Sequence, residues 1–146
     1  MFRGSAPAKI DDKGRLKIPT DFRGHLEERF GLDVFVTSIH GDSALVYPLA
    51  VWEELEARLA AMPSTHQATQ RFLQQVNYFG QQTRLDDQGR LVMPKILRDK
   101  AEIVGEVMVT GHVNHLVVWN RERLEARLQA TPLTEDDFKA LAELGI

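Results

Sequence analysis

The sequence predicts an α+β fold made of two tandem copies of one ββαββ-type unit. The main observation is an internal repeat, because the decapeptide IDDKGRLKIP at 10–19 returns as LDDQGRLVMP at 85–94. Further segments match in the same order, and the tetrapeptide Glu-Ala-Arg-Leu occurs in both copies, at 56–59 and at 125–128. A repeat of this kind is typically one supersecondary unit that buries its apolar face against a neighbouring copy, so each unit should span roughly 60 residues.

Each unit begins with a strand, a tight turn and a second strand. The turns at 12–14 and 87–89 contain Asp and Gly, which tight turns favour because Gly adopts positive φ freely and Asp bonds to nearby backbone. Side chains alternate between the faces of a strand, so Leu16 and Ile18 should point away from a cationic stripe. The stripe consists of Lys13, Arg15 and Lys17, and its counterparts in the second copy are Gln88, Arg90 and Val92. Of these three positions only the arginine is the same in both copies, so we expect the two copies to contribute unequally to the binding of a partner.

The rest of each unit contains helix and strand signals. Pro19 and Pro94 suit the first turn of short helices that begin at Thr20 and Lys95. Apolar runs predict strands at 34–39, 44–47, 106–110 and 116–119. Helical spacing predicts one further helix in each copy, with apolar residues that should belong to the core. These residues are Trp52, Leu55, Leu59 and Met62 in the first copy, and Leu124 and Leu128 in the second.

Two segments lie outside the repeat. Pro63 and Gly80 bracket an expected connecting helix at 67–79. The last segment, 133–146, should form a short helix with Thr134 as its N-cap and Asp137 three residues later. We therefore divide the chain into a first unit at 1–62, a connecting helix at 63–80, a second unit at 81–130 and a C-terminal helical tail at 131–146.

Composition indicates a compact protein. The chain has 146 residues, of which 43% are hydrophobic, and this is enough to build a core. It contains no cysteine, which excludes disulfides, thiol nucleophiles and thiolate metal ligands. No apolar stretch suits a signal peptide or approaches the ~20 residues of a membrane span, so we expect a cytoplasmic protein without membrane contact.

Charge is distributed unevenly along the chain. The net charge is −3, yet residues 1–23 carry six cations against three anions, and residues 84–100 carry five against three. The remainder of the chain therefore has a balance of −8. An acidic body that presents two basic segments favours contact with a polyanion such as a row of phosphates.

The arginines of the stripe also have a structural interpretation. Arg15 and Arg90 can each pair across the turn with the aspartate four residues earlier, Asp11 and Asp86. An exposed ion pair of this kind contributes only about 0–1 kcal/mol to the stability of the fold, and it would not require lysines beside it. Both roles therefore stay open at this point.

Other chemistries have weaker signals. The adjacent carboxylates at 11–12 and 86–87 could indicate acid–base catalysis, but neighbouring strand residues point apart and a turn explains them. His112 and His115 flank a predicted hairpin tip without further metal ligands nearby. The sequence has neither a phosphate-binding glycine loop nor a nucleophile elbow. We therefore expect no catalytic residue, no metal and no cofactor.

Several motifs occur in order along nearly the full chain. They are the opening MFRG, the two Asp-x-x-x-Arg motifs that end at Arg15 and Arg90, and LVYPL at 45–49 followed by Trp52. In these motifs the chain resembles the MraZ family of bacterial transcriptional regulators. The resemblance implies two SpoVT/AbrB-type units interleaved as a swapped-hairpin (double-psi-like) small β-barrel with flanking helices. It also implies a repressor that binds short direct repeats upstream of the cell-division and cell-wall gene cluster, including its own operon.

The resemblance further implies a ring-shaped homo-oligomer that is associated with the nucleoid and binds double-stranded DNA. Arg15 is then the central DNA contact and Arg90 its counterpart, with Asp11 and Asp86 orienting them at turns that contain Gly14 and Gly89. An arginine fork can hold either a guanine or a phosphate, and the sequence leaves both open. The candidate phosphate ligands are Arg3, Lys9, Lys13 and Lys17.

Two rival functions follow from the same residues. The first is a ring-forming assembly scaffold, in which the basic stripe meets acidic surfaces of sister subunits instead of DNA. The second is an enzyme, whose sign would be a pocket that contains Asp12, Asp87 and a histidine. The salt dependence of binding separates DNA contact from the scaffold, because phosphate binding releases counterions.

Overall fold

The structure is a computed structural model that describes residues 1–146. The strands are β1 (Ser5–Ile10), β2 (Arg15–Lys17), β3 (Asp33–Thr37), β4 (Ala44–Pro48), β5 (Gln81–Arg84), β6 (Arg90–Val92), β7 (Gly105–Gly111) and β8 (Leu116–Asn120). The helices are α1 (Thr20–Arg29), α2 (Leu49–Ala60), α3 (Gln67–Tyr78), α4 (Lys95–Ala101), α5 (Arg121–Ala130) and α6 (Glu135–Glu143). The predicted α+β class is therefore confirmed, as are the connecting helix and a C-terminal helix that starts with a Thr134–Asp137 capping box.

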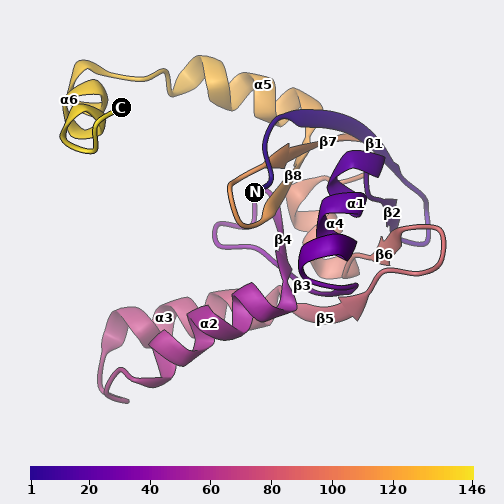
Figure 1. Ribbon diagram of the computed structural model, residues 1–146, viewed down its shortest axis with the longest axis horizontal. Coiled ribbons are helices and arrows are strands. Elements are labelled where there is room, and N and C mark those ends of the chain that lie inside the picture. The colour runs from indigo at the N-terminus through magenta and orange to yellow at the C-terminus, as the bar shows by residue number, and fades with distance from the viewer.

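The eight strands form one antiparallel sheet in the order β5-β3-β4-β8-β7-β1-β2-β6. Along this order, pairs that join the two repeats (β5 with β3, β4 with β8, β7 with β1, β2 with β6) alternate with pairs inside one repeat. The two ends of the order are connected by the β5–β6 turn, where the Asp86 amide donates to the Arg90 carbonyl at 2.9 Å. The sheet is thus a nearly closed barrel (Figure 1). The swapped-hairpin (double-psi-like) class stays a prediction.

Each repeat also bonds to the turn of the other repeat. The Ile18 amide donates to the carbonyl of Gly89 at 3.0 Å, and the Met93 amide donates to the carbonyl of Gly14 at 2.8 Å. Both glycines are in the left-handed region, with φ of 83° at Gly14 and 75° at Gly89. Because non-glycine residues adopt this region only at a cost, the repeated Gly allows each turn to present its carbonyl to the neighbouring repeat.

Alternation along the short strands places the repeated apolar residues inside the barrel. Leu16 on β2 and Leu91 on β6 are cross-strand partners, and both are fully buried. Ile18 and Met93, two residues further along, are buried as well. Burial of a large apolar side chain stabilises a fold by about 1.5–3 kcal/mol, so these positions anchor the two strands whose outer face is exposed.

The helices fall into two groups. α1 and α4 lie against the barrel and add Phe22, Leu26, Leu97 and Ala101 to its core. In contrast, α2 with α3 forms one projecting arm, and α5 followed by α6 forms another (Figure 1). The first arm is anchored by Trp52, which stacks on Phe35 at a centroid distance of 4.6 Å, and by the fully buried Val76.

The prediction that all apolar residues of the repeated helices are core is wrong. In α2, Trp52 is buried and Leu55 and Leu59 are half-buried, but Met62 just beyond the helix is exposed. In α5, Leu124 is half-buried and Leu128 is 65% exposed. Helical spacing aligns apolar side chains on one face, but these helices extend beyond the barrel surface, so the barrel does not cover their outer turns, and α3 covers α2 only in part.

The predicted strands and short helices agree with the structure to within a few residues. The division into units at 1–62, 63–80, 81–130 and 131–146 stays a prediction. None of the helices combines the length and the apolar character needed to cross a membrane.

Candidate nucleic-acid interface

The Asp11–Arg15 motif forms a closed turn. One carboxylate oxygen of Asp11, Oδ1, accepts hydrogen bonds from the backbone amides of Lys13 at 3.0 Å and Arg15 at 2.9 Å. The other oxygen, Oδ2, accepts from Arg15 Nε at 2.6 Å. A single aspartate therefore organises the turn backbone and fixes the guanidinium at its Nε edge.

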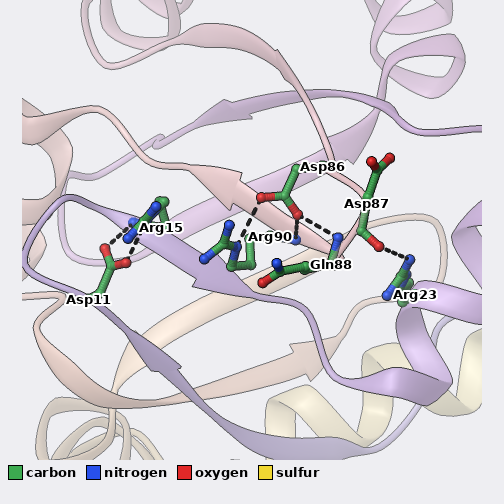
Figure 2. Close-up of polar contacts among 7 residues, drawn as sticks. All are labelled: Asp11, Arg15, Arg23, Asp86, Asp87, Gln88 and Arg90. Carbon is green, nitrogen blue, oxygen red and sulfur yellow. Dashed lines mark hydrogen bonds and ion pairs between the residues drawn. The ribbon is translucent and has the colours of Figure 1, made fainter.

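The second repeat reproduces this network (Figure 2). Asp86 Oδ1 accepts from the amides of Gln88 and Arg90, both at 2.9 Å, and Asp86 Oδ2 accepts from Arg90 Nε at 2.9 Å. The structural pairing of aspartate and arginine that the sequence suggested is confirmed. The proposed DNA contact of the arginines stays a prediction.

The pairing leaves part of each arginine available. No hydrogen bond within the protein involves Nη1 or Nη2 of Arg15 or Arg90. The side chains remain exposed to a similar degree, 37% for Arg15 and 28% for Arg90. Because a guanidinium held at Nε can still donate from both terminal nitrogens, each motif presents a preoriented fork suited to a base edge or a phosphate.

The hydrogen bonds also change the acidity of the aspartates. The backbone amide of Arg15 is the main cause that lowers the pKa of Asp11 below its ordinary value, and the Arg15 side chain adds to it. The amide and side chain of Arg90 lower the pKa of Asp86 in the same way. Both carboxylates therefore stay ionised at neutral pH, which keeps the arginines paired with a full negative charge.

The pairing of β2 with β6 unites the two motifs on one surface. Arg15 lies opposite Val92, and Lys17 lies opposite Arg90, with the buried Leu16 and Leu91 between them. Since alternate residues share a face, the four outer residues form one patch. We call this patch the β2–β6 face and define it as Arg15, Lys17, Arg90 and Val92. The sequence places the two stripes in separate repeats, and the register of β2 with β6 brings Lys17 next to Arg90.

The remaining predicted ligands differ in their distance from this face. Lys13 is exposed in the Asp11–Arg15 turn, next to the face. Lys9 is exposed on β1, where it precedes Ile10, the cross-strand partner of Leu16, and so points outward on the side of Lys17. Arg3 lies before the opposite end of β1 and lines a pocket with Pro19 and Phe22. The structure therefore gathers Lys9 and Lys13 around the β2–β6 face but not Arg3.

Two arginines that sequence reasoning did not assign hold the turns from outside. Arg23 of α1 donates from Nη2 to the Asp87 carbonyl at 3.0 Å (Figure 2). The same side chain packs over Gly89. Arg98 of α4 packs over Gly14 and donates from Nε to the Met93 carbonyl at 3.1 Å. Each turn is thus covered by a helix of the other repeat. The repeat itself contained the signal, because Arg23 and Arg98 occupy equivalent positions 75 residues apart.

The other candidate chemistries are located elsewhere. His115 stacks on Tyr47 with ring centroids 4.2 Å apart, and His112 lies 5.5 Å from it at the β7–β8 hairpin. Burial lowers the pKa of His115 to about 4, with the charge of His112 as a further cause. This ring is therefore neutral at physiological pH and serves as a stacking partner.

The comparisons with known proteins cover the full chain. The model of the MraZ protein family, which is described as antitoxin-like, matches residues 1–75 and 80–143. A relative from Koribacter versatilis is 48% identical over 147 residues, and one from Acidobacterium capsulatum is 43% identical over 146, each with 100% of both chains covered. A third, from Herpetosiphon aurantiacus, is 38% identical over 98% of this chain and 95% of its own. Each of the three is named a transcriptional regulator MraZ.

Proposed function

This chain belongs to the MraZ family, and on that premise we propose that it is a transcriptional regulator that binds double-stranded DNA through the β2–β6 face. One observation carries the proposal: Asp11 and Asp86 hold Nε of Arg15 and Arg90 and leave both terminal nitrogens of each guanidinium unpaired. Preoriented donors on a face with Lys17 suit recognition of phosphates and guanine edges. Lys9 and Lys13 add phosphate contacts beside the face.

The finer proposal concerns the target and the assembly. The regulator binds short direct repeats upstream of the cell-division and cell-wall gene cluster, including its own operon, as a repressor that acts in the cytoplasm at the nucleoid. It acts as a ring-shaped homo-oligomer. The exposed apolar residues of the second arm support association between copies, because Leu128, Phe138 and Leu144 are 57–75% exposed. A ring would bring several β2–β6 faces to tandem repeats, so that modest contacts combine through effective concentration.

The proposed chemistry is binding without catalysis. The sign expected of an enzyme was a pocket that contains Asp12, Asp87 and a histidine, whereas the turns that hold these two aspartates are covered by the side chains of Arg98 and Arg23. No group of three or more His, Asp or Glu side chains has the arrangement of a metal site. The rival scaffold function uses the same cations on acidic protein surfaces, so only a binding experiment separates the two.

Fluorescence anisotropy tests the proposal directly. The labelled DNA is a fragment from upstream of this gene that contains tandem repeats, compared with a scrambled fragment at two salt concentrations. We expect binding that is selective for the repeats and is lost in Arg15→Ala. The logarithm of the binding constant should fall with the logarithm of the salt concentration, with a slope of about −0.9 per contacted phosphate. Equal binding to both fragments would reduce the function to general phosphate affinity, and no binding at low salt would favour the scaffold.

A further inference from the structure

Val92 is the one apolar residue of the β2–β6 face. The 75-residue repeat makes Arg15 equivalent to Arg90 and Lys17 equivalent to Val92. The strand register follows the same symmetry, since Arg15 pairs with Val92 and Lys17 pairs with Arg90. The face is therefore two-fold symmetric in its arginines, and it is asymmetric only where Val92 replaces a lysine.

Packing does not account for the valine. Its neighbours Leu91 and Met93 point inward and are 1% and 0% exposed, whereas Val92 points outward and is 45% exposed. It lies among three cations and belongs to neither buried apolar cluster. The equivalent outer position of β2 carries a lysine, so the barrel does not require an apolar side chain there.

The geometry points to Val92 as a specificity-determining residue that contacts the C5-methyl group of a thymine in the major groove. This inference rests on the proposed DNA binding and assigns it a base preference. The major groove accepts a two-stranded β-ribbon, and the thymine methyl is the apolar group that its base edges display. When the guanidinium groups of Arg15 and Arg90 face the DNA, Val92 lies on the opposite strand from Arg15, and Lys17 lies on the opposite strand from Arg90.

The asymmetry has a consequence for the DNA site. A two-fold symmetric face would prefer an inverted repeat and would bind it with equal affinity in either orientation. Val92 on one side and Lys17 on the other make the two sides of the arginine pair chemically different, so each face prefers one orientation of its site. Copies that present their faces to the DNA in the same orientation, as the subunits of a cyclic ring do, then bind best to sites that all run in the same direction, as direct repeats do.

Thymine-to-uracil replacement isolates the methyl group. The full-length protein first selects its site from a library of random duplexes, and each thymine of the enriched duplex is then replaced singly by uracil, which lacks only this methyl. For the wild type we expect one position, adjacent to the bases read by the arginines, at which uracil weakens binding about fourfold, the value of one buried methyl group. In Val92→Lys the same replacement should have no effect.

A swap variant supplies the matched control. Lys17→Val combined with Val92→Lys keeps the composition and net charge of the face and reverses its asymmetry. The uracil-sensitive position should then move to the other side of the site, while the thermal midpoints of both variants stay close to that of the wild type. The role of Val92 would be overturned if the uracil-sensitive position stayed in place in the swap variant. It would also be overturned if uracil weakened binding equally in the wild type and Val92→Lys, or if no position were sensitive to uracil. Failure to enrich any sequence would instead overturn the proposed function itself.

Discussion

The Arg23 guanidinium donates from Nη2 to the carbonyl oxygen of Asp87 at 3.0 Å, although the two residues are 64 positions apart in the chain. This bond joins a helix of the first repeat to the turn of the second repeat. Arg98 holds the equivalent place over Gly14, the turn of the first repeat. The segments that orient Arg15 and Arg90 are therefore stabilised across the repeat boundary, and neither turn is expected to be well formed without the other repeat.

Arg23→Ala should lower the free energy of unfolding by about 1 kcal/mol, because it removes a hydrogen bond to backbone and the packing of the side chain over Gly89. Urea unfolding followed by circular dichroism measures the change. The control is Glu27→Gln, which disturbs the ion pair to Arg23 Nε at 2.8 Å but leaves the bond to Asp87 in place. Equal losses in the two variants would show that the bond to Asp87 adds nothing.

Gly14→Ala should destabilise the protein more than Gly4→Ala. Both glycines have positive φ, 83° and 82°, so an alanine is strained at either position. At Gly14 an added Cβ would lie 2.7 Å from Arg98 Nε, whereas at Gly4 nothing lies within 4 Å. Displacing Arg98 breaks its bond to Met93, and this should add about 1 kcal/mol to the difference in urea unfolding. Matching losses would mean that Arg98 moves aside without cost.

Asp11→Asn combined with Asp86→Asn should reduce the acid sensitivity of the fold. Hydrogen bonds lower the pKa of both aspartates below the ordinary value of 3.8, so the folded state binds their protons less readily than the unfolded state. The stabilisation they provide is therefore present above pH 3.8 and is lost as the pH falls through the folded pKa values. Urea midpoints at neutral and acidic pH measure it. The control pair, Asp12→Asn with Asp87→Asn, should keep the acid sensitivity of the wild type.

His115→Phe should flatten the stability profile in weak acid. Burial lowers the pKa of His115 from 6.5 to about 4, so between these values the unfolded state binds a proton that the folded state rejects. Wild-type stability should rise with pH across this window, by at most about 1.4 kcal/mol per pH unit. Phe keeps the stack on Tyr47 and cannot titrate, and unfolding from pH 4 to 6.5 compares the two proteins. An unchanged profile in the variant would assign the pH dependence to another group.

Arg15→Ala should weaken DNA binding more than Arg90→Ala. The two arginines have equivalent aspartate partners, Asp11 and Asp86, but Lys13 lies in the turn of Arg15, whereas Gln88 takes that position in the turn of Arg90. Lys17 neighbours both arginines, on the strand of Arg15 and opposite Arg90, so Lys13 gives Arg15 one more candidate phosphate ligand nearby and the loss of Arg90 should cost less. Anisotropy titrations of both variants on the repeat fragment measure the ratio, with circular dichroism to show that each is folded. Equal losses would contradict the asymmetry.

The local structure and the identity of the motif could be predicted from the order of the residues alone. The duplicated IDDKGRLKIP pattern predicted the turns, the inward Leu16 and the pairing of Arg15 with Asp11, because turn chemistry and alternation act over a few residues. The Thr134 cap and the helix starts after Pro19 and Pro94 were predictable for the same reason, whereas the caps His66 and Asn120 were not predicted. Family membership followed from the order of the motifs.

The way in which the two copies combine depends on long-range packing. Pairing of β2 with β6 placed Lys17 beside Arg90 and Val92 beside Arg15, and it brought Arg23 over the turn of the other repeat. Strand register between distant segments depends on how the whole barrel closes, which no local pattern encodes. The exposure of Leu128 was not predictable for the same reason. Helical spacing predicts which residues share a face of a helix, but the packing of the whole barrel decides which helix faces are buried.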